Sequence, residues 1–271
     1  MKTLVVQSAA DQRPEWIERC LTSVRSWADH AQYDYHFMGD ELFDFVPAWY
    51  LAKCGDSYPV ATDLARLVWM QQLLQDRVAD CVIWLDADVL VFAPQLRIAP
   101  QTTCLFGYEL WVQPKSGKSG KSGKSGKSGL EVRGNVHNAV AAFRQDCPIL
   151  PFLIEAIQRL MRRADPGHIA PQMMGPKLLS HLHNLVGFEI THAVGAVSPE
   201  LLKDLAGQPG AAMALWSARI REPMLAANLA ASTTSAVATN TVEVNECLNS
   251  VVDTLYLCVD GFAGAESLVK S

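Results

Sequence analysis

Two aspartates separated by one residue follow a continuous apolar run. Residues 81–85 read Cys-Val-Ile-Trp-Leu, and Asp86, Ala87 and Asp88 come next. An apolar run of this length indicates a central strand that is buried on both faces. The two carboxylates would then lie at the carboxyl end of a strand, the edge where open α/β sheets bind ligands. We therefore predict a binding site around Asp86 and Asp88.

The spacing of these carboxylates favours a divalent cation. Two close negative charges raise each other's pKa unless a cation lies between them. Mg²⁺ and Mn²⁺ prefer oxygen ligands, and Mg²⁺ completes its shell with substrate phosphates. Asp86 and Asp88 are thus the predicted metal ligands. The expected substrate group is a diphosphate, toward which the metal would act as a Lewis acid.

Two other interpretations of this motif stay open. The aspartates could belong to a solvated turn, since a bare Asp-x-Asp is common. They could also be the nucleophile (Asp86) and the general acid (Asp88) of a haloacid-dehalogenase-type phosphatase. In those phosphatases the motif follows the first strand of the fold, whereas Asp86 comes after a predicted β-α-β-α stretch.

The surrounding pattern predicts a mixed α/β sheet flanked by helices, with extra helices in the C-terminal half. Thr62 is the expected N-cap of a helix over residues 63–75. A Gly175-Pro176 turn is expected to open a short helix. Strands are predicted over residues 3–7, 33–38, 81–85, 89–92, 104–110, 136–143 (a short one) and 188–193. The other predicted helices cover residues 15–28, 148–163 and the Ala-rich stretch 222–235.

One pair of motifs resembles a known group of enzymes. Asp63 and Arg66 stand about twenty residues before Asp86 and Asp88. This arrangement resembles Ser-Asp-x-x-Arg, a helix, then Tyr-x-Asp-x-Asp, the pattern of the DXD sugar transferases. That group includes yeast-type initiating mannosyltransferases, capsular polysaccharide transferases and clostridial glucosylating toxins. The resemblance covers roughly residues 3–180 and implies a GT-A-like fold, a Rossmann-like nucleotide-diphospho-sugar transferase.

The resemblance also implies roles for individual residues. Asp88 would bind the metal directly, and Asp86 would contact ribose and reach the metal through water. Asp63 and Arg66 would hold the sugar hydroxyls and the diphosphate, for which the guanidinium fork is suited. The backbone around Gln7 and Ser8 would meet the nucleobase. The alternative for Asp63 and Arg66 is an exposed ion pair on one helix, worth a few tenths of a kcal/mol.

The activity implied is transfer of a hexose from a nucleoside diphosphate sugar, UDP-linked, with retention of configuration. The acceptor, whether glycan, lipid or protein, is not readable from the sequence. The chain is expected to be one catalytic domain, residues 1–271. Residues 1–112 would bind the nucleotide sugar, 113–130 would form a flexible Lys-Ser-Gly segment, and 131–271 would form the acceptor side.

A third metal ligand near the C-terminus, often a histidine in this fold, is missing from the pattern. The last histidine, His192, is expected to be a core residue of a strand. Asn228 and the Trp216-Ser217 pair are polar candidates in the correct half. Without such a ligand the chain could be a degenerate protein that binds a nucleotide sugar without transferring it.

Other residues have both a functional and a structural interpretation. His137 and Asn138 could line an acceptor site or cap a turn. His181 and His183 are expected on different faces of a helix, which disfavours a shared metal. Aromatic residues that could stack on a base or sugar are expected to pack in the core instead; they are Trp49, Tyr50 and Tyr58.

Composition limits the class of protein. A formal charge of −5 gives no electrostatic footprint for nucleic acid. The sequence lacks a secretory apolar region and an apolar stretch long enough to span a bilayer. The seven scattered cysteines favour free thiols, so we expect a cytoplasmic protein.

Five consecutive Lys-Ser-Gly triplets occupy residues 115–129 and include five of the ten lysines. A segment without any apolar side chain cannot contribute to a core, so we expect it to be solvated. It is either an engineered replacement or placeholder, or a natural low-complexity loop. We assign it no function.

Overall fold

The computed structural model describes residues 1–55, 57–115, 129–229 and 240–268. Its main sheet has six strands in the order β2-β1-β3-β6-β5-β7, and a second sheet has three in the order β4-β9-β8. The strands are β1 (Thr3–Ser8), β2 (Asp34–Met38), β3 (Cys81–Leu85), β4 (Val89–Val91), β5 (Cys104–Pro114), β6 (Leu130–Arg144), β7 (Glu189–Thr191), β8 (Val194–Ala196) and β9 (Ala226–Asn228).

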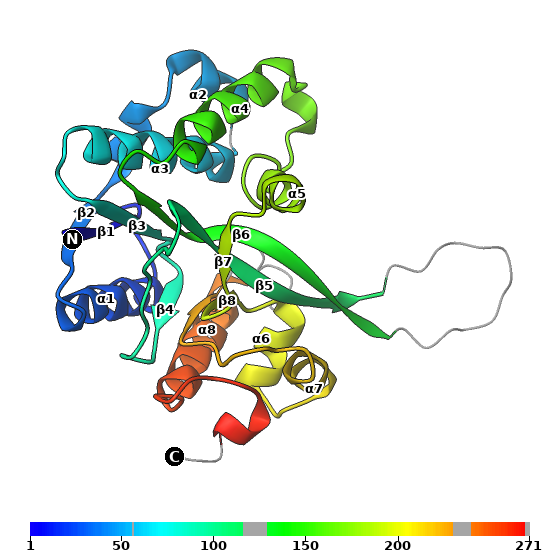
Figure 1. Ribbon diagram of the computed structural model, residues 1–271. Coiled ribbons are helices and arrows are strands. Elements are labelled where there is room, and N and C mark those ends of the chain that lie inside the picture. The colour runs from blue at the N-terminus through cyan, green and yellow to red at the C-terminus, as the bar shows by residue number, and fades with distance from the viewer. Residues whose placement is uncertain (56, 116–128, 230–239, 269–271) are drawn as a thin grey trace, which may run out of the picture.

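Helices cover both faces of the main sheet (Figure 1). The helices are α1 (Glu15–His30), α2 (Ala48–Cys54), α3 (Tyr58–Gln75), α4 (Ile149–Arg163), α5 (Pro176–Val186), α6 (Pro199–Ala206), α7 (Ala211–Ser217) and α8 (Thr241–Tyr256). Short 3₁₀ turns are η1 (Asp40–Phe45), η2 (Pro166–His168) and η4 (Ala265–Leu268). The predicted mixed α/β sheet with flanking helices is therefore confirmed, as are the extra helices of the C-terminal half, α6 to α8.

The side chains of β3 alternate between the two faces of the sheet, which explains why helices cover both faces. Val82 and Trp84 pack in the cluster that contains the buried faces of α3 and α4. Ile83 and Leu85 pack in another cluster, which contains Val24 of α1. Successive side chains of a strand point to opposite faces, so a strand with an apolar residue at every position needs a layer on each side. The prediction of a central strand buried on both faces is confirmed.

The sheet changes direction beside β3. β1 is parallel to β2 and β3, whereas β6 runs antiparallel to both β3 and β5. Residues 136–143 were expected to form a short strand, but β6 spans 15 residues. It is long because it pairs with β3 at one end and with β5 along its length. β5 and β6 together form a ribbon that projects from the body toward the Lys-Ser-Gly segment (Figure 1).

Two helix predictions were wrong. Thr62 does not cap α3, because the helix begins at Tyr58 with Ser57 as N-cap. The Ala-rich stretch 222–235 is not helical where the structure describes it, since Ala226–Asn228 forms β9 between β4 and β8; residues 230–235 lie outside the described part. Pairing on both sides has overridden the helix propensity of alanine. The helix expected after Gly175-Pro176 is confirmed as α5.

Two further expectations do not hold in full: that His192 is a core residue of a strand, and that three aromatic residues of α2 and α3 pack in the core. His192 lies at a bend after β7, partly buried, and not in the core of a strand. Tyr50 is buried as expected, but Tyr58 and Trp49 are 65% and 38% exposed because they lie at the outer side of their helices. Among the described residues, no helix combines the length and apolar character that crossing a bilayer requires.

Candidate active site

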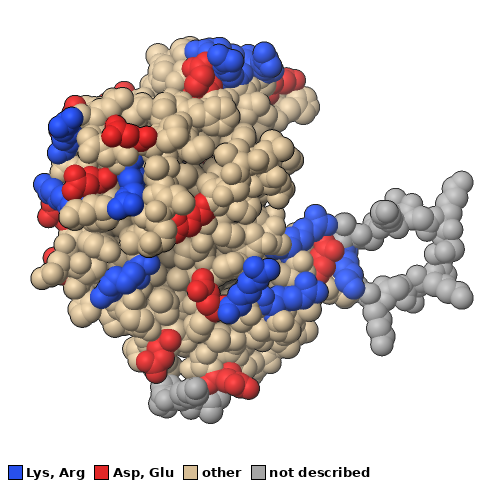
Figure 2. Space-filling view, in the orientation of Figure 1, with Lys and Arg blue, Asp and Glu red and all other residues tan. Residues whose placement is uncertain are grey.

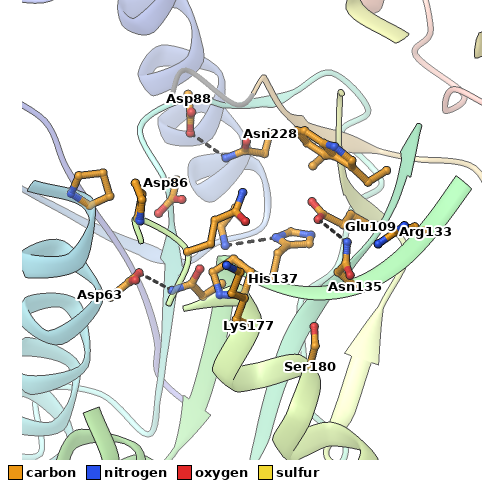
Figure 3. Close-up of a pocket in the computed structure, with 18 of the residues that line it drawn as sticks. Asp63, Asp86, Asp88, Glu109, Arg133, Asn135, His137, Lys177, Ser180 and Asn228 are labelled. Atoms are coloured by element: carbon orange, nitrogen blue, oxygen red, sulfur yellow. Dashed lines mark hydrogen bonds between the residues drawn. The ribbon is translucent and has the colours of Figure 1, made fainter. Parts of the chain in front are cut away.

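A cavity of about 470 Å³ opens at the carboxyl end of β3 (Figure 3). Asp86 and Asp88 line it, and both come from the turn between β3 and β4. Opposite them, in Figure 3, lie Glu109 and Asn135 of the β5–β6 ribbon. The cavity also receives Asp63, Arg66, Trp111, Gln113, Arg133, His137, Asn138, Lys177, Ser180, His181 and Asn228. The predicted sheet edge is thus a concave polar site.

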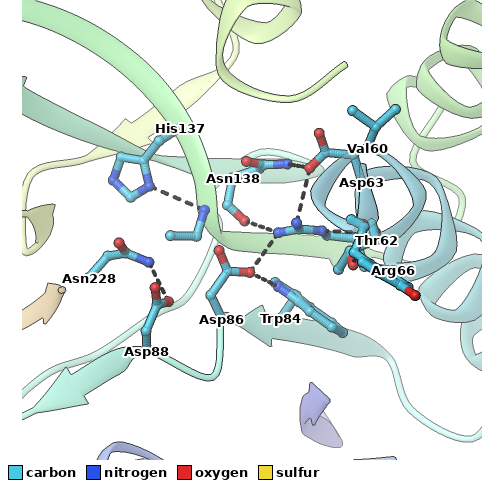
Figure 4. A network of polar contacts seen from close by, with 12 residues as sticks. Val60, Thr62, Asp63, Arg66, Trp84, Asp86, Asp88, His137, Asn138 and Asn228 are labelled. Carbon is cyan, nitrogen blue, oxygen red and sulfur yellow. Dashed lines mark hydrogen bonds and ion pairs between the residues drawn. The ribbon is translucent and has the colours of Figure 1, made fainter. Parts of the chain in front are cut away.

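Arg66 joins the two predicted motifs at the floor of this cavity (Figure 4). Its Nη1 donates to Asp86 Oδ1 at 2.7 Å and to the Asn138 carbonyl oxygen at 2.9 Å. Its Nη2 donates to Asp63 Oδ1 at 3.0 Å. Trp84 donates from Nε1 to the same Asp86 Oδ1 at 2.6 Å, and its ring lies 5.1 Å from the Arg66 guanidinium carbon. Asp86 is therefore held in place from two sides.

The Asp63–Arg66 pair is buried, which excludes the exposed ion pair considered from sequence. Only 5% and 6% of the Asp63 and Arg66 side chains are exposed. Burial raises the pKa of Asp63 to about 6, against the lowering effects of Arg66 and of a hydrogen bond from Asn138 Nδ2 at 2.7 Å. A buried ionised pair without such bonds would be costly. This network therefore needs every one of its members.

The backbone of Gly175 lies so close to this network that no side chain fits at that position. A Cβ at this position would lie 2.8 Å from Asn138 Nδ2 and 2.9 Å from Asp63 Oδ2. The loop before α5 can pack onto the Asp63–Asn138 bond only because residue 175 has no side chain. The Gly175-Pro176 motif therefore positions α5 as one wall of the cavity.

Asp88 has a different partner from Asp86. Asn228 donates from Nδ2 to Asp88 Oδ1 at 2.8 Å (Figure 4). The antiparallel pairing of β4 and β9 places Asn228 opposite Val89, and the Leu229 amide donates to the Asp88 carbonyl oxygen at 3.0 Å. The structure thus brings one of the polar candidates from the C-terminal half to the Asp-x-Asp motif. The other candidate pair is elsewhere: Trp216 is buried against Phe262, and Ser217 bonds within α7.

The oxygen atoms at this position fit a hard divalent cation. Asp86, Asp88 and Asn228 offer carboxylate and amide oxygens, the donor types that Mg²⁺ and Mn²⁺ prefer. One oxygen of Asp86 already accepts from Arg66 and Trp84, so its second oxygen, Oδ2, is the one available for a ligand. No group of three or more His, Cys, Asp or Glu side chains forms a metal cluster in the described part of the chain. An ion here would need Asn228 or substrate oxygens to complete its shell.

Gln7 holds the backbone of Asp86, whereas Ser8 bonds away from the site. Gln7 is fully buried and donates from Nε2 to the Asp86 carbonyl oxygen at 3.2 Å, while Tyr35 donates to its Oε1 at 3.1 Å. Ser8 donates to the Gly39 carbonyl oxygen at 3.2 Å. Neither residue lines the cavity described above. Their expected contact with a nucleobase therefore stays a prediction.

His137 is a structural residue of β6 rather than a turn cap. Its Nδ1 accepts from the Ala139 amide at 3.2 Å, so the proton is on Nε2, which lies 3.1 Å from the Val194 carbonyl oxygen. Burial lowers its pKa to about 4, which keeps the ring neutral. Its neighbour Asn138 is the group that joins Asp63 and Arg66. Of the histidines on α5, His181 lines this cavity and His183 lines a different one.

The ribbon residues of the cavity were missed from sequence, except His137, which was expected either to line an acceptor site or to cap a turn and which does line the cavity. Glu109, Trp111 and Gln113 alternate along β5, and Arg133, Asn135 and His137 alternate along β6. Burial raises the pKa of Glu109 to about 7, although Asn135 donates a hydrogen bond to it at 3.2 Å. The period-two spacing of polar residues was a usable signal. It was hidden because the Lys-Ser-Gly triplets separate the two strands in the sequence.

Comparisons with known proteins give limited similarity. No protein-family model and no curated protein matches the chain. One similar solved structure is a glycosyltransferase involved in the glycosylation of the major capsid of PBCV-1, with a TM-score of 0.49 and 12% identity. That match covers 92% of this chain and 100% of the other. A protein from STIV matches with a TM-score of 0.27 and 9% identity over 68% of this chain and 78% of its own. Similarity at these levels assigns neither a family nor an activity to the chain.

Proposed function

We propose that this chain is a GT-A-like, metal-dependent glycosyltransferase that moves a hexose from a UDP-linked sugar to an acceptor, with retention of configuration. The observation that carries the proposal is the buried network in which Arg66 joins Asp63 to Asp86 beside Asp88 in one cavity. A solvated turn would not need a buried arginine to hold its first aspartate. The sequence resemblance to DXD sugar transferases supports the same activity and implies the retaining course.

Each residue has a distinct role in this proposal. Asp86, Asp88 and Asn228 would hold Mn²⁺ or Mg²⁺, which when bound would neutralise the diphosphate as it leaves. Arg66 adds positive charge at the floor of the cavity and fixes Asp86. Asp63 accepts from Arg66 and Asn138, and its carboxylate is the group proposed to orient the sugar hydroxyls. Positioning of this kind supplies much of the rate enhancement in transfer reactions.

The phosphatase alternative has less support. Its nucleophile would be Asp86, yet Arg66 and Trp84 both donate to one oxygen of this carboxylate. Hydrogen bonds to a charged oxygen stabilise it and lower its reactivity. In addition, Asp86 follows the third strand of the chain, not the first.

Thermal unfolding with UDP and Mn²⁺ tests the proposal directly. A ligand at about one hundred times its Kd stabilises the native state by about 2.7 kcal/mol, which corresponds to a rise in Tm of about 5 °C. Asp88→Asn should remove this rise, because it deletes a charge that would face the ion. The matched control is Asp29→Asn, at an exposed aspartate on α1, which should keep the rise.

Turnover separates a transferase from a degenerate binder. Release of UDP from UDP-sugars in the presence of Mn²⁺, with water receiving the hexose when no other acceptor is present, is expected for the native chain and not for Asp88→Asn. Stabilisation by UDP without any release would support the non-catalytic alternative. Hydrolysis of simple phosphomonoesters that Asp86→Asn abolishes would overturn the proposal in favour of a phosphatase.

A further inference from the structure

One face of the β5–β6 ribbon continues the cavity away from the aspartates. Glu109, Trp111 and Gln113 of β5 lie at alternate positions, as do Arg133 and Asn135 of β6. Alternate residues of a strand share one face. The pairs Glu109 with Asn135, Trp111 with Arg133, and Gln113 with Glu131 are directly opposite in the register. Five residues of this face line the same cavity as Asp86 and Asp88; they are Glu109, Trp111, Gln113, Arg133 and Asn135.

The side chains of this face are held by one another. Asn135 donates to Glu109 at 3.2 Å. Glu131 Oε1 accepts from Gln113 at 3.0 Å and from Arg133 Nη2 at 2.7 Å. These bonds restrict Glu109, Gln113 and Asn135, so less side-chain entropy would be lost at these residues when a ligand binds. The face is a preorganised polar surface around one indole.

The composition of the face indicates the kind of ligand. Carboxylate, amide and guanidinium groups are planar and offer two hydrogen-bonding atoms each, which suits neighbouring hydroxyls. An indole ring provides a flat apolar surface with a polar edge. Arg133 is paired with Glu131, and these two charges offset one another, so the local charge favours neither a strong anion nor a strong cation. Both signs of charge are also seen where the ribbon leaves the body in Figure 2.

The opposite wall of the cavity comes from α5 and the loop before it. Gln172, Lys177 and His181 line it there. Ser180 ties this wall to the ribbon, because its hydroxyl accepts from the Val136 amide at 3.0 Å. The space between ribbon and helix is therefore a groove with polar groups on both sides, open toward the aspartates (Figure 3).

We infer that this groove binds a neutral saccharide as the acceptor, with its apolar face on Trp111 and its hydroxyls on Glu109, Gln113 and Asn135. The inference rests on the proposed function, since it assigns the substrate that would receive the hexose. It commits to a saccharide and not to a lipid or a peptide. A sugar ring has both an apolar face and closely spaced hydroxyls, and the groove offers a partner for each.

Saturation-transfer NMR with neutral methyl glycosides tests the inference. The probes are methyl glucoside, galactoside, mannoside and N-acetylglucosaminide, each in both anomers, with UDP and Mn²⁺ present. At least one probe should receive saturation at its C–H protons. Trp111→Ala should weaken its binding about tenfold, because the stacking surface is lost. Trp111→Tyr should restore most of it, and Trp49→Ala, at an exposed tryptophan on α2 outside the groove, should leave it unchanged.

The outcomes separate the two proposals. Stabilisation by UDP and Mn²⁺ without any glycoside signal would overturn the saccharide acceptor and leave the transferase standing. A glycoside signal that depends on Trp111 without any effect of UDP would leave a saccharide-binding groove standing, but it would overturn the transferase and with it the role of the saccharide as acceptor. Equal weakening by Trp111→Ala and Trp49→Ala would also overturn the inference. If Trp111→Ala does not fold, Gln113→Ala provides the same test, with about tenfold weaker binding expected.

Discussion

Arg66 donates to two carboxylates and to two backbone carbonyls, those of Thr62 and Asn138, from a position that solvent barely reaches. Every acceptor it satisfies belongs to the predicted site or is adjacent to it. Removing one member of such a buried network leaves an uncompensated charge, which costs about 3–5 kcal/mol. The network thus links the geometry of the site to the stability of the fold.

Asp63 makes this link dependent on pH. Its pKa in the folded protein is about 6, above the ordinary value of about 4, because the carboxyl group is buried. Between these two values the folded protein holds the proton and the unfolded chain does not. The stability that Asp63 contributes is therefore largest below pH 4, falls as pH rises from 4 to 6, and is constant above that.

Asp63→Asn removes this titration and so provides the test. The free energy of unfolding of the native chain, minus that of the variant, should fall by about 2 kcal/mol between pH 4 and pH 7. Urea unfolding of both proteins at several pH values measures the difference. A difference that does not change with pH would contradict the raised pKa.

At the scale of elements, a register shift between β5 and β6, with the extra residues on β6, fixes how β6 enters the site. The register shifts between Phe106 and Gly107, and the His137 ring lies where a side chain of residue 107 would be. A Cβ on Gly107 would be 2.2 Å from the ring. The ring in turn contacts Val194 of β8 through Nε2. One glycine therefore lets the two sheets meet beside the cavity.

Gly107→Ala should push the His137 ring out of this position. We expect the free energy of unfolding to fall by about 1–3 kcal/mol, because the packed ring must move and loses its bond to Val194. Gly167→Ala is the control, since its Cβ would meet only Asp165 Oδ1, at 3.7 Å. Chemical unfolding of both variants measures the effect. Equal stability of the two would show that His137 is not confined.

At the scale of the whole molecule, the long ribbon separates the site from the Lys-Ser-Gly triplets. Residues 116–128 lie outside the described part, and the residues at either end of them are paired. The Lys115 amide donates to the Gly129 carbonyl oxygen at 2.8 Å. Pro114 and Leu130 are opposite one another in the register. The two strands therefore stay paired up to the first and last residues of the triplet segment, Lys115 and Gly129.

Replacing residues 116–128 by Asn-Gly should leave the fold intact. The exchange removes no apolar side chain, and loop-closure free energy changes slowly with length. We expect Tm to change by less than about 2 °C and the response to UDP and Mn²⁺ to persist. Differential scanning calorimetry of the shortened chain checks this. A loss of many degrees would mean that the triplets take part in the fold.

Local pattern was sufficient for the elements whose burial repeats along the chain. The apolar run at 81–85 predicted β3, and its acidic end predicted the cavity edge. These inferences succeed because the burial of a strand is encoded in neighbouring residues.

Tertiary structure decided everything that depends on distant pairing. Asn228 meets Asp88 because β9 pairs with β4, although its alanines favour a helix. Asp63 is buried because α3 begins a turn earlier than its sequence indicates and packs under the loop at Gly175. The polar face around Trp111 forms because β5 and β6 pair in register on either side of the triplets. Such contacts depend on which strands become neighbours, and only the packed core determines that.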